Sequence, residues 1–203
     1  MGLHAGNISR IVGHIPLAPR GTIIAVSELP AALITDLVQI KLLGEKKQDE
    51  NLKFRRFMKS RDHSDRILRR TAERIEDQID CTQCANCCKT STTEVTERDI
   101  EKLARHLRIS PDQFSADYTM LQEEVGAMTR VLKFTEGAGC VFLDGKLCSV
   151  YDARPANCQR YPHVVRGNGS IASRMWAFVD SASVCPIVYN SLEAFKAELR
   201  FRR

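Results

Sequence analysis

The chain of 203 residues is long enough to bury a hydrophobic core and suits one domain, or one domain with an appendage. A hydrophobic content of 43% with 27% charged residues excludes a disordered or low-complexity protein. The net charge of +5 is modest. The most apolar stretch, residues 22–43, is interrupted by charged residues and a proline, and the first ten residues lack a secretory signal. A cytoplasmic protein with no membrane contact is therefore expected.

The first half of the chain predicts helices. Residues 1–20 show no periodicity and suggest a loose arm. A helix is expected over residues 30–43, beginning at Pro30. One or two helices are expected over residues 50–79, because Leu68, Ala72, Ile75 and Ile79 recur at helical steps.

Nine basic residues lie between positions 53 and 74 against three acidic ones: Lys53, Arg55, Arg56, Lys59, Arg61, Arg66, Arg69, Arg70 and Arg74. Such a run most often marks a solvated helix face. Nucleic acid or an acidic protein is the alternative interpretation. A nucleic-acid partner is not expected but is not excluded by this segment. A protein partner is also possible.

Two helix starts follow the middle of the chain. Thr96 and Asp99 approximate a capping box before an amphipathic segment. Ser110 is expected to cap a second helix, with Pro111 at its first position and Gln113 closing the box. Phe114 and Tyr118 are then expected on the buried side.

The pattern changes to short strands from residue 128. Residues 130–134 form a short apolar run, and Asp144-Gly145 predicts a hairpin over residues 141–148. A second hairpin is expected at Asn168-Gly169, followed by a strand with Ile171, Met175, Trp176 and Phe178. A final helix is expected to begin at Asn190 or Ser191 and to bury Leu192, Phe195 and Leu199.

These elements predict an α+β fold, with helices first and then a small antiparallel sheet of hairpins, organised around a cysteine metal site. The predicted division places a helical N-terminal extension with the basic segment in residues 1–77. A cysteine-cluster domain is expected in residues 78–203.

All eight cysteines lie in this second part: Cys81, Cys84, Cys87, Cys88, Cys140, Cys148, Cys158 and Cys185. Four of them fall within residues 81–88, which simple packing does not explain. In a reducing cytosol, clustered thiols more often bind metal than form disulfides. Thiolates select zinc or iron–sulfur clusters.

Spacing favours an iron–sulfur cluster slightly over zinc. Cys81, Cys84 and Cys87 follow one another at two-residue gaps, as in a bacterial-type [4Fe–4S] loop. The fourth ligand of such loops is often followed by proline, and Cys185-Pro186 has this sequence. A zinc site more often uses two C-x2-C pairs.

The doublet Cys87-Cys88 suggests two sites or one multinuclear site, because neighbouring side chains are expected to diverge. Cys88 could join Cys140, Cys148 and Cys158, so that two four-sulfur sites use all eight thiols. One site with spare thiols is the alternative, and one or two of the distant cysteines could be simple buried hydrophobes.

Two arginines are candidate cofactor contacts. Arg154 and Arg160 could donate to cluster sulfurs or to an acidic substrate, or could be surface groups. His163 is more plausibly solvated than a ligand. No signature identifies a catalytic residue, so the enzyme question stays open.

The motif at residues 81–88, Gly139-Cys140, the segment from Cys148 to Cys158, and Tyr161-Pro162 together resemble the YkgJ-type CxxCxxCC cysteine-cluster family, over about residues 78–190. The resemblance implies a zinc- or iron-chelating domain. Two positions depart from the family pattern, with Ala85 where glycine is common and Gln159 where arginine often follows the last motif cysteine.

Three functions follow from these patterns. The first is a metal-binding protein with a cysteine-ligated iron–sulfur or zinc centre and no assigned reaction. The second is an iron–sulfur oxidoreductase or a protein methyl-transfer enzyme, since a related cluster occurs in flagellin lysine N-methylases. The third is a structural zinc module that binds nucleic acid or an acidic protein.

Overall fold

The computed structural model describes residues 32–124 and 126–202. The expected loose arm and the expected helix start at Pro30 lie outside these residues. The helices are α1 (Leu37–Lys46), α2 (Gln48–Lys59), α3 (Asp65–Glu76), α4 (Cys81–Cys84), α5 (Asn86–Thr90), α6 (Glu97–Leu107), α7 (Pro111–Tyr118), α8 (Ala156–Arg160), α9 (Ile171–Ser181) and α10 (Pro186–Glu198), with a 3-10 turn at Tyr151–Ala153. The strands are β1 (Thr119–Glu124), β2 (Ala127–Leu132), β3 (Phe134–Thr135), β4 (Gly139–Cys140), β5 (Leu143–Asp144) and β6 (Leu147–Cys148).

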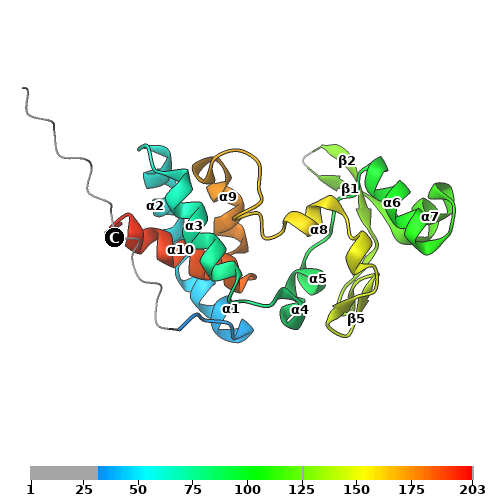
Figure 1. Ribbon diagram of the computed structural model, residues 1–203, viewed down its shortest axis with the longest axis horizontal. Helices are drawn as coiled ribbons and strands as arrows, with labels where there is room; N and C mark the ends of the chain where they lie inside the picture. Colours follow the sequence, from blue (N-terminus) through cyan, green and yellow to red (C-terminus); the bar gives the residue numbers. More distant parts are fainter. Residues whose placement is uncertain (1–31, 125, 203) are drawn as a thin grey trace, which may run out of the picture.

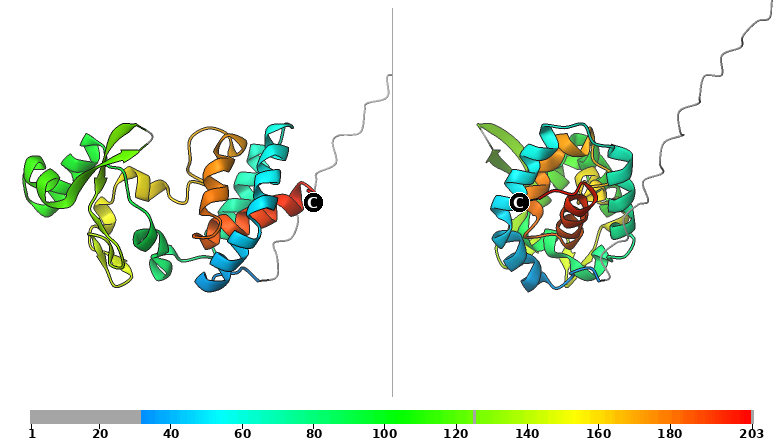
Figure 2. Two further views of the ribbon diagram at one scale, coloured as in Figure 1. Left: turned by 180° about the vertical axis from the view of Figure 1, so that it is seen from behind. Right: turned by 90° about the vertical axis from the view of Figure 1, so that its left-hand side faces the viewer.

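The molecule is elongated and has two lobes (Figure 1). The helical lobe contains α1, α2, α3, α9 and α10, and the sheet lobe contains α6, α7 and the strands. Both Figure 1 and the reverse view in Figure 2 place α4, α5 and α8 between the lobes. This arrangement confirms the α+β class, with small two-stranded antiparallel pairs, β1–β2, β3–β4 and β5–β6.

Each lobe has its own hydrophobic core. The helical core joins side chains from both halves of the chain, including Phe54, Leu68, Met175 and Phe195. The second core is smaller and contains Ile100, Leu103, Phe114, Leu132 and Phe142. The helical lobe is thus built from segments before and after the sheet lobe, because α2 packs on α9 and α3 packs on α10. The domain boundary after residue 77 stays a prediction.

The helices after the cysteine octapeptide begin where the capping residues indicate. Thr96 and Asp99 form the capping box at the start of α6. Ser110 accepts the Gln113 N–H at 3.1 Å, and Pro111 opens α7. Phe114 is fully buried and its ring lies 5.3 Å from the Tyr118 ring. The predicted helix starts, their caps and the burial of Phe114 are confirmed, whereas the closing of a capping box by Gln113 stays a prediction.

The first described helix begins later than expected. Asp36, not Pro30, caps α1, and its side chain accepts the Gln39 N–H at 2.8 Å. The helix α10 begins earlier than expected, because Cys185 is its N-cap and Pro186 its first residue. Asn190 therefore lies inside α10, where its amide binds the backbone of Ile34 and the Pro186 carbonyl.

The hairpin at Asp144-Gly145 is confirmed, with Leu143 opposite Cys148 and Gly145 at a φ of +60°. The sequence did not indicate β1, which pairs with β2 over six residue pairs beginning with Thr119 opposite Leu132. Met120 and Leu121 are both exposed on β1, so this strand lacks the alternation of buried and exposed residues.

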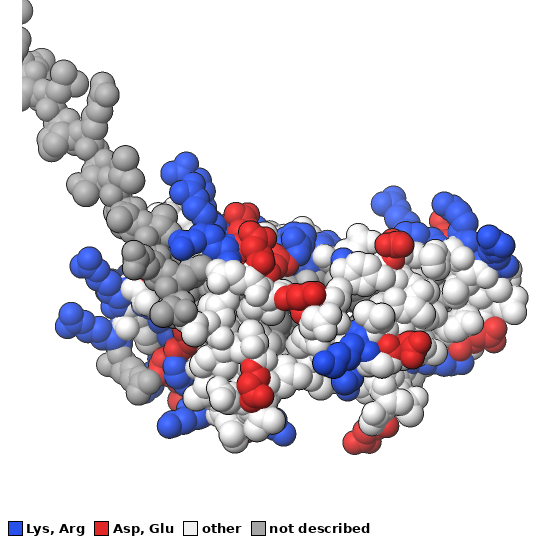
Figure 3. Space-filling model, turned by 60° about the horizontal axis from the view of Figure 1, so that its bottom comes forward, with Lys and Arg blue, Asp and Glu red and all other residues white. Residues whose placement is uncertain are grey.

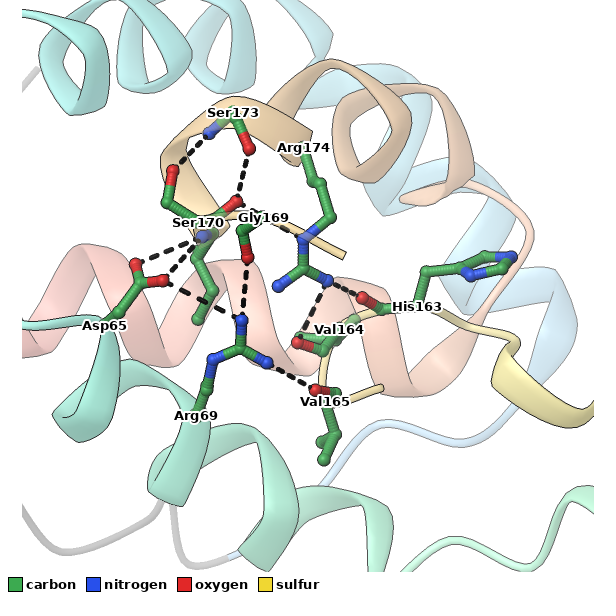
Figure 4. Close-up of polar contacts among 10 residues, drawn as sticks. Asp65, Arg69, His163, Val164, Val165, Gly169, Ser170, Ser173 and Arg174 are labelled. Carbon is green, nitrogen blue, oxygen red and sulfur yellow. Dashed lines mark hydrogen bonds and ion pairs between the residues drawn. The ribbon is translucent and has the colours of Figure 1, made fainter. Parts of the chain in front are cut away.

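The second hairpin prediction is wrong. Residues 163–170 form a loop, and the expected strand is the helix α9, with Ile171, Met175 and Phe178 buried and Trp176 exposed. Figure 4 shows that two arginine side chains bind carbonyl groups of this loop. Arg69 donates to the carbonyls of Val165 and Gly169, and Arg174 donates to that of His163.

In the part of the chain that the structure describes, no helix combines the length and the apolar character needed to cross a bilayer.

Candidate metal centre

Five of the eight cysteines lie on the helices between the lobes, two lie on strands of the sheet lobe, and one caps α10 in the helical lobe. Cys81 and Cys84 are the two ends of α4, Cys87 and Cys88 lie on α5, and Cys158 lies on α8. Cys140 and Cys148 end β4 and β6, and Cys185 caps α10. All eight are free thiols, from an exposed Cys81 to a buried Cys185.

A cavity of about 470 Å³ opens beside these segments. Six cysteines line it: Cys81, Cys87, Cys88, Cys140, Cys148 and Cys158. Its wall also includes Arg154, Tyr161 and His163. The structure therefore brings residues from α4 to α8, which the sequence separates widely, to one hollow between the lobes.

The turn between α4 and α5 carries the octapeptide. Asp80 caps α4 by accepting the Thr82 N–H at 2.8 Å. Ala85 then adopts a left-handed conformation with a φ of 51°, which reverses the chain into α5. Glycine is the residue that this conformation favours. The departure at Ala85 thus keeps the loop shape at the cost of backbone strain.

One group of thiols comprises Cys185 and the two cysteines of α4, whose charges act on it. Burial raises the pKa of Cys185 to about 12, the N–H groups of Val188 and Ile187 lower it, and the nearby Cys81 and Cys84 add to the rise. Burial likewise raises the pKa of Cys81, and the charge of Cys84 contributes. Cys185 belongs to the helical core, so this group is attached to the helical lobe.

A second group of thiols surrounds Cys88. Burial raises the pKa of Cys140 to about 11, the Phe142 N–H lowers it, and Cys88, Cys158 and Cys148 raise it. Burial also raises the pKa of Cys148 and of Cys158, with Cys88 among the neighbouring charges of both. Cys140 and Cys148 pack against the second core, so this group is attached to the sheet lobe.

The doublet lies where the groups meet. The neighbouring Cys88 thiol, followed by burial, raises the pKa of Cys87, and the charges of Cys185 and Cys158 add to this. The Cys87 thiol in turn lowers the pKa of Cys88, as does the charge of Arg154. The expectation that the two side chains diverge stays a prediction.

Sequence reasoning missed three residues that hold the segments on which distant cysteines lie. Gly139 approaches α5 so closely that an added Cβ would lie 2.6 Å from the Cys88 carbonyl oxygen. Asn86 donates to the Val184 carbonyl at 2.7 Å, next to Cys185. Thr93 places its hydroxyl 3.5 Å from the Cys158 sulfur. Gly139 alone carried a sequence signal, since it adjoins a motif cysteine.

The two predicted cofactor arginines differ in placement. Arg154 lies half-buried on the cavity wall, and its positive charge lowers the pKa of Cys88, Cys148 and Cys158. Arg160 donates to the Ala156 carbonyl at 3.3 Å within its own helix. Its contact with a cofactor stays a prediction.

His163 and Tyr161 also face the cavity. Burial, with help from the charges of Arg160 and Arg174, lowers the pKa of His163. Burial raises the pKa of Tyr161, and the thiols of Cys185 and Cys87 add to the rise. Tyr161 therefore reaches from the segment after α8 to the thiols beside α10.

The basic segment does not form one uniform surface. Lys53, Arg56 and Lys59 are exposed on α2, whereas Arg69 is committed to the loop carbonyls and to Asp65. On the face shown in Figure 3, Lys and Arg side chains gather toward both ends and are interspersed with Asp and Glu. A nucleic-acid or protein partner on this segment stays a prediction.

The donor set fits zinc or iron by its chemistry, because soft thiolates in partly buried surroundings are the ligands these metals take. Within the described residues, no three His, Cys, Asp or Glu side chains converge closely enough to form a ready-made metal site. The two groups are thus defined by the proximity of their thiols and not by coordination geometry.

A protein-family comparison matches residues 80–186, more than half of the chain, to the CxxCxxCC family, described as a "putative zinc- or iron-chelating domain". The chain belongs to the CxxCxxCC family. The matched range runs from Asp80, the cap of α4, to Pro186, the first residue of α10, and so includes all eight cysteines. No solved structure matches this chain.

Proposed function

We propose that this member of the CxxCxxCC family binds an iron–sulfur centre through its cysteine thiolates, with zinc as the alternative metal. The observation that carries the proposal is the gathering of six cysteines on the wall of one cavity between the lobes. A buried thiol of raised pKa keeps its proton at neutral pH unless a metal ion displaces it, because the metal ion competes with the proton for the sulfur. The run of Cys81, Cys84 and Cys87, with Cys185 nearby, supports iron–sulfur.

The proposed setting is the reducing cytoplasm. Thiols that hold a metal must stay reduced, and a reducing compartment keeps them so. The eight free thiols are consistent with that setting.

The bound group would supply electron transfer if it is an iron–sulfur cluster, or a structural tie if it is zinc. The chain's own residues would then hold it and shape its surroundings. Cys81, Cys84, Cys87 and Cys185 are the candidate ligands on one side, and Arg154 supplies positive charge near thiolates on the other.

Anaerobic purification followed by iron, sulfide and zinc analysis tests the proposal. We expect iron and acid-labile sulfide in comparable amounts. Colourless protein with stoichiometric zinc and no sulfide would exclude the iron–sulfur form, and protein with neither metal would exclude metal binding.

Cys84→Ser tests the ligand role of the octapeptide. We expect most of the metal of its group to be lost, because a thiolate ligand is removed. Gln83→Ser is the matched control, since Gln83 is the exposed neighbour on the same short helix α4. Equal metal content in the two variants would contradict the assignment of Cys84.

A second candidate function is an enzyme, either an iron–sulfur oxidoreductase or a protein methyl-transfer enzyme. The open cavity beside the thiols favours it, because a purely structural site needs no such space. Titration with dithionite, followed by absorbance and electron paramagnetic resonance, tests the redox version. A cluster that neither accepts nor returns an electron would argue against it.

A further inference from the structure

The cysteine octapeptide is tied to the helical lobe by one side chain. Asn86 lies between Cys84 and Cys87, and its Nδ2 donates to the Val184 carbonyl at 2.7 Å. Val184 directly precedes Cys185, which is buried in the helical core. This single bond joins segments 98 positions apart and sets the octapeptide against the start of α10.

A second tie comes from α6 in the sheet lobe. The Oδ1 atom of Asp99 accepts the Ala156 N–H at 2.8 Å, at the first residue of α8. One turn later, Lys102 donates to the Arg154 carbonyl at 2.5 Å. Together they fix the start of α8, and Cys158 lies two residues after Ala156 on that helix.

The two carboxylate oxygens of Asp99 accept hydrogen bonds from different segments of the chain. Oδ2 accepts the Thr96 N–H and hydroxyl, which completes the capping box of α6. Oδ1 is left for Ala156. A capping box needs only the first of these contacts, so the second is an additional link from α6 to the segment that carries Cys158.

The two ties act on different thiols. The Asn86 bond concerns Cys185 and the octapeptide, on the side of the helical core. The Asp99 bond concerns Cys158, which lines the cavity together with Cys88, Cys140 and Cys148. Of these, Cys140 and Cys148 pack against the second core. Because the lobes have separate cores, each tie can hold its own group of thiols.

We propose that Asn86 and Asp99 are positioning residues for two separate metal centres, the first formed by Cys81, Cys84, Cys87 and Cys185 and the second by Cys88, Cys140, Cys148 and Cys158. This inference rests on the proposed metal binding. The doublet Cys87-Cys88 contributes one sulfur to each centre, and the two centres are neighbours.

Two variants of the full chain test the proposal, each with a matched control. Asn86→Ala removes the donor to Val184, and Thr90→Ala is its control, because Thr90 bonds only within α5, to the Asn86 carbonyl. Asp99→Ala removes the link to Ala156, and Thr96→Val is its control, because it also breaks the capping box but spares Oδ1.

Each protein is loaded with Co²⁺ under anaerobic conditions, and binding is followed by thiolate-to-cobalt charge-transfer absorbance. Individual cysteines are then alkylated with N-ethylmaleimide and followed by peptide mass spectrometry. The wild type is expected to bind two equivalents and to protect both groups. Circular dichroism of each variant shows whether it is folded.

In Asn86→Ala, we expect Cys81, Cys84 and Cys185 to be alkylated at least about tenfold faster, with one cobalt equivalent weakened, while Cys140, Cys148 and Cys158 stay protected. A tenfold change corresponds to about 1.4 kcal/mol, which one hydrogen bond can supply. In Asp99→Ala, we expect the reverse pattern. Both control variants are expected to resemble the wild type.

Equal loss of protection across all eight cysteines in either variant would overturn the inference and indicate one shared centre. A single cobalt equivalent in the wild type would also overturn it, while leaving metal binding intact. A wild type that binds no cobalt and no iron would instead refute the proposed function itself.

Discussion

The guanidinium of Arg154 lies over the ring of Tyr151, with Cζ 3.8 Å from the ring centroid. This contact holds a positive charge on the cavity wall, among the thiols of Cys88, Cys148 and Cys158. A cation packed on an aromatic face keeps its charge while its hydrogen-bond donors stay available.

Arg154→Gln is therefore expected to weaken metal binding at pH 7 by roughly tenfold, because the thiolates lose a stabilising charge. Competitive zinc titration measures the change. Arg154→Lys should restore part of the affinity, since the charge returns without the planar stacking. Arg98→Gln is the matched control, because Arg98 is exposed on α6 and does not line the cavity. An equal loss in the control would argue that general surface charge is responsible.

Gly139→Ala is expected to destabilise the protein by about 2–4 kcal/mol, because the new methyl group would meet the Cys88 carbonyl at 2.6 Å and the residue has a φ of +88°. Chemical denaturation of the metal-free protein measures this. Gly137→Ala is the control for backbone strain alone, since Gly137 has a φ of +81° and no atom within 4 Å of the added Cβ. Equal losses in both would deny any role to the close approach.

Asp99 should make stability depend on acid pH. Burial raises its pKa, but the Ala156 N–H and the Thr96 hydroxyl and N–H outweigh burial and lower it below the ordinary 3.8. A folded pKa below the unfolded one gives stability that is present above about pH 4 and is lost as the pH falls through the folded pKa.

The measurement for Asp99 compares the free energy of unfolding between about pH 3 and pH 6 in wild type and Asp99→Asn. The variant is expected to be less stable near pH 6 and to lose less stability on acidification. Parallel curves for the two proteins would contradict the assignment.

Arg69→Met is expected to cost about 2–4 kcal/mol, because the carbonyls of Val165 and Gly169 lose a charged donor. Arg70→Met is the matched control, since Arg70 is exposed, and its change should stay within about 0.5 kcal/mol. Urea denaturation distinguishes the two. A small effect in both variants would show that the loop does not depend on Arg69.

For a test of nucleic-acid binding, Lys53, Arg56 and Lys59 are better targets than Arg69 and Arg70. Changing Arg69 to Glu would also disrupt the loop, so a loss of binding could not be assigned to charge alone.

The sequence predicts local structure correctly where backbone groups are hydrogen-bonded by residues only a few positions away. The capping box at Thr96 and the turn at Asp144-Gly145 use residues a few positions apart, and both were predicted correctly. The sequence predicts a strand where α9 forms, because Asn168-Gly169 is typical of a hairpin turn. The buried Ile171, Met175 and Phe178 recur at steps of four and three residues, and this helical pattern agrees with the structure where the turn signal does not.

The site was predictable only in part, because its positioning contacts are long-range. The cysteine pattern identifies the family, whereas the ligand roles of the cysteines and the contact of Arg154 with a cofactor stay predictions. Nothing local distinguishes Asn86 from other polar loop residues, and its partner Val184 lies 98 positions away.

The helical lobe combines the segments before and after the sheet lobe, which has a consequence for synthesis on the ribosome. The helices α2 and α3 emerge before the sheet lobe but cannot complete their core until α9 and α10 follow. Cys88, Cys140, Cys148 and Cys158 are all translated before Cys185, whose helix is the last element of the chain. On the proposed assignment of two centres, the group that contains Cys88 could bind metal on the nascent chain, whereas the group that contains Cys185 would be complete only after translation reaches α10.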